Sequence, residues 1–143
     1  MPLADFAKRL RALAETLYLW LGALSGLNGQ AREKVALYAE EIAATLARAS
    51  IALAGMDAQP ADKQRILATV RELGRITGYL ETIVGALEHH LDGRKLAGVK
   101  RRLETLQPFE LDALLAAEKP FAQAARLASA EGFFRALADA LRA

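Results

Sequence analysis

Two adjacent histidines, His89 and His90, are the side chains of this sequence best suited to binding a metal ion or moving a proton. Glu88 and Asp92 flank them. Neighbouring helical residues point about 100° apart, so the two imidazoles cannot hold one ion together. The sequence also lacks the E-x-x-H pairs of carboxylate di-iron bundles. We therefore predict no metal site and no cofactor, and we place the histidines near a helix C-terminus, where an imidazolium ion is favoured.

Three glutamates, Glu33, Glu40 and Glu41, are the candidates for acid–base chemistry, and they fall on the polar side of a helix expected over residues 30–54. A working general acid needs a carboxyl group that is removed from water and close to a partner. Their pattern indicates surface charges paired with basic neighbours instead. The sequence has no cysteine, which excludes thiolate catalysis, disulfides and cysteine-based zinc sites. We therefore predict that the protein is not an enzyme.

A basic segment, GRKLAGVKRR at residues 93–102, stands out in a chain whose formal net charge is only +2. If Leu96 and Val99 face the core, the basic side chains face outward. Such a stripe can follow a phosphate backbone with salt-dependent affinity, but no aromatic residue is present to stack on bases. An acidic partner surface and an ordinary solvated face are the other two interpretations. The candidate nucleic-acid contacts are Arg94, Lys95, Lys100, Arg101 and Arg102.

The stretch TLYLWLGALSGLNGQA, residues 16–31, carries no charge, and its strongly apolar part covers only residues 17–24. A membrane span needs about 20 apolar residues, so we expect none here. The spacing of the leucines assigns Trp20 to the core and leaves Tyr18 and Leu19 on the opposite side of the helix. Either a C-terminal segment covers them, through Phe121, Phe133 or Phe134, or they face another subunit. The candidate interface residues are Tyr18, Leu19 and Trp20.

Helices must position all of these groups, because Ala, Leu, Arg, Glu and Lys dominate the sequence. A heptad seam with spacings of three and four predicts a first helix over residues 3–25. Its members are Leu3, Phe6, Leu10, Leu13, Leu17, Trp20, Leu24 and Leu27. Similar apolar stripes predict helices over 30–54, 60–91, 94–107 and 120–142, and a short one in FELDALLAAE.

Glycines at positions 74, 78 and 85 interrupt the predicted helix over residues 60–91. Each glycine costs about 1 kcal/mol relative to alanine in a helix interior. Close approach of another helix would explain them, and a ligand groove beside Tyr79 is the alternative.

Short connections between long amphipathic helices predict an all-α, up-and-down antiparallel bundle, with about four long helices followed by short C-terminal helices. We expect one domain over residues 1–143, with its core in 1–107 and a C-terminal appendage in 108–143.

The function predicted from these features is that of a non-enzymatic structural or interaction subunit. It would self-assemble as a homo-oligomer through apolar helix faces and hold nucleic-acid backbone through its basic helix. A monomeric adaptor for one protein partner is one alternative. A small-ligand-binding bundle, with a pocket lined by Trp20, Tyr79 and the glycines, is another.

The N-terminal sequence MPLADFAKRLRAL mixes charges among its apolar residues, so we expect no signal peptide. The predicted location is the cytoplasm or the inside of an assembled particle. Arginines outnumber lysines by 13 to 6, and Asn28 is the only asparagine. This bias fits a heat-adapted source and a GC-rich genome equally.

Overall fold

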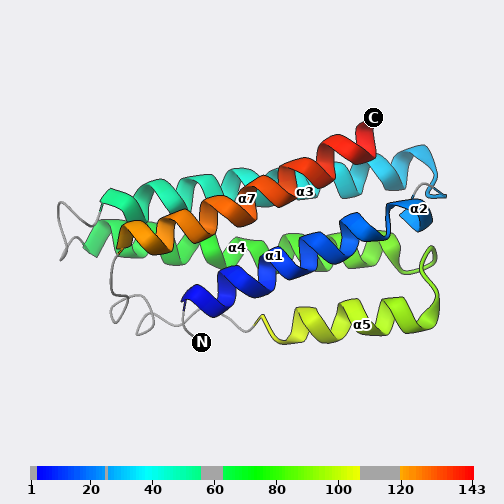
Figure 1. Cartoon of the computed structure of the whole chain (residues 1–143), viewed down its shortest axis with the longest axis horizontal. Helices are drawn as coiled ribbons and strands as arrows, with labels where there is room; N and C mark the ends of the chain where they lie inside the picture. Colours follow the sequence, from blue (N-terminus) through cyan, green and yellow to red (C-terminus); the bar gives the residue numbers. More distant parts are fainter. Residues whose placement is uncertain (1–2, 25, 56–62, 107–119) are drawn as a thin grey trace.

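The computed structural model describes residues 3–24, 26–55, 63–106 and 120–143, and these form an all-α helical bundle (Figure 1). The expected short helix at residues 109–118 lies outside this range. In chain order the helices are α1 (Leu3–Leu19), α2 (Leu21–Leu24), α3 (Gly29–Ala54), α4 (Lys63–Leu87), α5 (Gly93–Glu104) and α7 (Pro120–Arg142). Figure 1 shows α1, α4 and α7 running in one direction and α3 and α5 in the other. The prediction of an all-α bundle is confirmed.

Helix α7 belongs to the centre of the bundle, whereas the sequence suggested a C-terminal appendage. It packs along both α3 and α1, and Figure 1 shows it running beside α3. Gly132 does not divide it. Its apolar residues recur at spacings of three and four, as in α1, so α7 carries a full seam that requires burial. The buried side chains of that seam are Leu127, Ala130, Phe134, Leu137 and Leu141.

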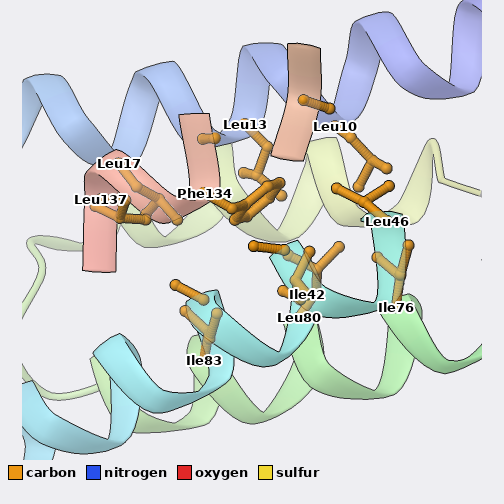
Figure 2. Packing of buried hydrophobic residues seen from close by; sticks show 14 of the residues in the cluster. Leu10, Leu13, Leu17, Ile42, Leu46, Ile76, Leu80, Ile83, Phe134 and Leu137 are labelled. Atoms are coloured by element: carbon orange, nitrogen blue, oxygen red, sulfur yellow. The ribbon is translucent and has the colours of Figure 1, made fainter. Parts of the chain in front are cut away.

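The core is a layer of aliphatic side chains around Phe134, which is fully buried. Figure 2 shows its ring between Leu13 of α1 and Ile42 of α3, with Leu80 of α4 beyond. Helix α4 reaches this core through α3, along which it packs, and it makes fewer contacts with α5. Helices α3 and α7 therefore hold the bundle together, and α5 lies at its edge.

The first predicted helix ends earlier than its seam suggested. The backbone N–H of Trp20 is shared between the carbonyl oxygens of Thr16 and Leu17, each 3.2 Å from the nitrogen, and the helix resumes as α2. Every other member of the seam is buried, but Trp20 is only partly so. Gly22 follows two residues later, and glycine lowers the local preference for helix.

Asn28 and Asp92 cap the N-termini of α3 and α5. The Asn28 side chain accepts a hydrogen bond from the backbone N–H of Ala31 at 2.8 Å, which caps α3. Asp92 accepts one from the N–H of Lys95 at 2.9 Å and caps α5. Such caps satisfy backbone donors that have no partner within the helix.

Arg142 fastens the C-terminal end of α7 to α3. Its guanidinium lies 2.8 Å from a carboxylate oxygen of Glu33 and 2.6 Å from one of Glu40. The hydrogen bond from Arg142 lowers the pKa of Glu33 below its usual value of 4.5. The ion pair therefore stabilises the folded protein at pH values above the ordinary carboxyl pKa. This stabilisation is lost as the pH falls through the lowered pKa of Glu33.

We expect Arg142→Gln to lower the melting temperature at neutral pH, because the Glu33 and Glu40 carboxylates lose their common partner. The difference from the wild-type protein should shrink as the pH falls through the lowered pKa of Glu33, because the protonated carboxyl no longer forms the ion pair. Melting curves at several pH values measure it. Arg126→Gln, an exposed change on the same helix, is the control and should show no such pH dependence. A difference that persists at acid pH would contradict the ion-pair explanation.

Candidate interaction surfaces

Tyr18 and Leu19 form an exposed apolar surface at the end of α1. Tyr18 is 45% exposed and Leu19 is 81% exposed. Together with Glu15 and with Phe133 of α7 they line a hollow of about 230 Å³. We call Tyr18, Leu19 and Phe133 the α1 patch.

Charged groups border this patch on one side. Arg11 lies over the ring of Phe133, with its guanidinium carbon 4.7 Å from the ring centroid, and its Nε donates to a Glu15 carboxylate oxygen at 3.2 Å. An apolar centre with a charged border is typical of protein–protein contacts.

The expectation that the C-terminal segment covers Tyr18 and Leu19 is wrong for the described side chains of α7. Phe134 points into the core and is fully buried. Phe133 lies beside the two residues without burying them. The third candidate, the side chain of Phe121, lies outside the described residues.

Trp20 belongs to a different surface from Tyr18 and Leu19. It packs against the edge of the core, and the Lys95 ammonium lies 5.7 Å from the centroid of its ring. Trp20 therefore joins the end of α1 to α5. The three candidate interface residues do not form one patch, because the break after Leu19 turns the indole toward α5.

The basic side chains of α5 divide by their surroundings. Lys95 is partly buried against Trp20, whereas the other four are exposed. Lys100 pairs with Glu88, which follows the last residue of α4, with 3.5 Å between Nζ and a carboxylate oxygen. Arg101 and Arg102 lie in the last turn, where the helix dipole favours cations.

One basic side chain near this surface was not identified from the sequence. Arg9 of α1 donates from Nη1 to the carbonyl oxygen of Thr105 at 2.9 Å, just beyond α5. A contact between residues 96 positions apart leaves no local signal in the sequence. The exposed basic surface that results consists of Arg9, Arg94, Arg101 and Arg102.

The glycines of α4 do not mark a close approach. Gly74, Gly78 and Gly85 are exposed, and a Cβ atom added at each would meet no heavy atom within 4 Å. The first explanation offered for them, a closely packed helix, is therefore wrong within the described chain, and the ligand groove stays a prediction.

Trp20 and Tyr79, which the ligand-binding alternative placed in one pocket, contact different neighbours. The ring of Tyr79 packs against Tyr38 of α3, with centroids 5.7 Å apart, and its hydroxyl accepts a hydrogen bond from Arg75 at 2.7 Å. Trp20 instead contacts Lys95 of α5.

His89 and His90 are both exposed just after α4, and the described residues contain no group of His, Asp and Glu side chains arranged to hold a metal ion. Among the helices of the described chain, none combines the length and hydropathy needed to cross a bilayer. No protein-family model, no curated protein and no solved structure matches this chain.

Proposed function

We propose that this protein is a non-enzymatic interaction subunit that associates with further copies of itself through the α1 patch. The observation that supports this most directly is the exposure of Leu19, at 81%, beside Tyr18 and Phe133. Single exposed leucines are common on proteins, but a leucine, a tyrosine and a phenylalanine around one hollow indicate a contact surface.

The α1 patch is too small to form a stable interface by itself. Burying one leucine side chain contributes about 2 kcal/mol. A stable interface removes roughly 1,200–2,000 Å² of surface from water, so neighbouring helix faces must contribute as well. A hot spot of a few apolar side chains within a larger contact fits this arrangement.

Leu19→Glu tests the proposal. A buried carboxylate in the contact would cost far more than the leucine contributes, so the mass of the assembly should fall while the helix content is retained. Light scattering coupled to size-exclusion chromatography measures the mass, and far-ultraviolet circular dichroism measures the helix content. Leu67→Glu is the matched control, because Leu67 is 49% exposed on α4, away from the patch. An unchanged mass for Leu19→Glu would remove the patch from consideration.

A monomeric adaptor is the competing function, and the same experiment separates the two. A wild-type mass of 15.5 kDa at every concentration would exclude self-association and favour a different protein as the partner of the α1 patch.

Binding of nucleic-acid backbone is a second candidate function, supported by the exposed Arg94, Arg101 and Arg102 with Arg9 nearby. We expect the triple change of Arg94, Arg101 and Arg102 to Gln to weaken binding to duplex DNA of any sequence. The slope of log affinity against log salt should flatten by about 3, since each phosphate contact contributes roughly 0.9.

Fluorescence anisotropy at several salt concentrations measures this slope. A triple change of Arg71, Arg75 and Arg126 to Gln removes the same charge from other exposed positions and serves as the control. Equal losses of DNA affinity in the two triple variants would mean that binding depends only on the net charge of the protein and that α5 is not a binding site.

A further inference from the structure

Helix α3 has an exposed apolar ridge that none of the described helices covers. Leu37 is 45% exposed and Ile51 is 71% exposed, and Ala44 lies midway between them. Residues seven apart return to nearly the same side of a helix, so the three form a line along α3. We call Leu37, Ala44 and Ile51 the α3 ridge.

The neighbours of α3 lie on either side of this ridge. Glu40 reaches Arg142 of α7 on one flank, and Arg48 reaches Glu72 of α4 on the other, at 3.0 Å between Nε and a carboxylate oxygen. The ridge between these flanks faces solvent. Exposure of its isoleucine side chain to water contributes no favourable free energy.

Two side chains of opposite charge also lie on the α4 flank of the ridge. Helical geometry places Glu41 and Arg48, seven residues apart, on that same flank, before and after Ala44. The Glu41 carboxylate has no ion-pair partner among the described residues. Arg48 uses Nε for Glu72 and Nη2 for the Thr45 hydroxyl at 3.2 Å, which leaves Nη1 for another acceptor.

We propose that a second copy of this chain docks on the α3 ridge, with the two α3 helices antiparallel and related by a two-fold axis at Ala44. Leu37 is seven residues before Ala44 and Ile51 is seven after it, so each Leu37 meets Ile51 of the second copy. Each Arg48 meets Glu41 of the second copy on one flank. Because the side chain of Ala44 is small, the two helix axes can approach each other to about 8 Å at the point where they cross.

A parallel arrangement is unfavourable for the same residues. It would exchange the two flanks, so that each Glu41 meets Glu40 of the second copy and Arg48 meets no carboxylate, and like charges at a contact oppose association. The antiparallel arrangement brings opposite charges together twice, as a self-complementary two-fold contact requires.

A hollow beside the ridge supports this register independently. It measures about 350 Å³ and lies between α3 and α4, and its lining is Arg48, Ile51, Ala52, Gln64, Arg65 and Ala68. In the antiparallel register Leu37 of the second copy arrives next to Ile51, at the edge of this hollow. The two-fold axis repeats the insertion, so both hollows receive a leucine.

The proposal rests on self-association as the proposed function, but it uses a surface that shares no residue with the α1 patch. The absence of cysteine from the sequence allows a direct test by introducing single cysteines. A disulfide forms only where two Cα atoms come within about 7 Å, so cross-linking reports the register.

Ala44→Cys should cross-link to itself under mild oxidation, because the residue lies on the two-fold axis. Leu37→Cys and Ile51→Cys should each remain uncross-linked alone and should cross-link to one another when the two proteins are mixed. Ala97→Cys, exposed on α5, is the control for random collision. Docking raises the effective concentration, so dimer from Ala44→Cys should exceed that control on the order of tenfold on a non-reducing gel.

Two results would overturn the proposal. Cross-linking of Leu37→Cys to itself would show a parallel contact, and equal yields from Ala44→Cys and Ala97→Cys would show no docking at the ridge. If Leu19→Glu lowers the mass while Ala44→Cys fails to cross-link, the ridge proposal fails and the proposed function stands. If Ala44→Cys cross-links while Leu19→Glu leaves the mass unchanged, the α1 patch fails and the ridge is supported.

Discussion

Replacing Phe134 with alanine should lower the free energy of unfolding by about 3–5 kcal/mol, the largest effect we expect from a single substitution. The ring is fully buried and lies between α1 and α3, so its removal leaves a cavity that no single helix can close (Figure 2). Because α7 is central, the loss should appear in one cooperative transition of the whole bundle. Urea unfolding followed by circular dichroism measures it.

Phe133 provides the matched control for this prediction. It is the same residue type one position earlier in α7, but it is only partly buried and lines the α1 patch. Phe133→Ala should cost less, about 1 kcal/mol, because the ring lies at the edge of the core and part of its surface stays in contact with water. Equal losses in the two variants would contradict the central position of α7, and so would a Phe134→Ala transition that leaves most of the helix content intact.

The triple replacement of Gly74, Gly78 and Gly85 by alanine should stabilise the protein by about 2 kcal/mol. Replacing glycine with alanine at a compatible position stabilises a protein by roughly 0.4–1 kcal/mol, because it reduces the conformational entropy of the unfolded chain. The three positions are helical and exposed, and an added Cβ atom meets nothing within 4 Å. Denaturant unfolding of the triple variant measures the gain.

The reverse change at an exposed alanine serves as the control. Ala97→Gly on α5 should destabilise the protein by about 1 kcal/mol, since it introduces the same penalty that the glycines of α4 carry. A loss of stability in the triple alanine variant would mean that these positions are in contact with another molecule. A change in oligomeric mass would then identify the glycine face as an interface.

Much of the fold follows from local patterns in the sequence. The three-and-four spacing of Leu10, Leu13 and Leu17 predicted the buried side of α1, and the structure confirms it. The prediction for residues 30–54 agrees with α3 to within one residue. Periodicity succeeds here because a regular helix sets the direction of every side chain from its position alone.

The candidate sites were predicted less completely. Tyr18 and Leu19 are exposed as their position opposite the seam implied, and most of the basic residues of α5 face outward. The environments of Trp20 and Lys95 were not predicted, because their contact joins two helices far apart in the chain. The α3 ridge also escaped sequence analysis, since nothing local shows which side of a broad apolar helix stays uncovered.

Residue spacing therefore predicted where most of the described helices lie and which stripe of apolar side chains each of them buries. The tertiary structure alone decided which buried faces meet, and with it the central place of α7, the pairing of Arg142 with Glu33 and the exposure of the α4 glycines. The physical reason is that helix formation and amphipathicity depend on residues within a few turns. The choice among partners depends on how all the apolar faces can be buried at once, and several arrangements satisfy each face alone.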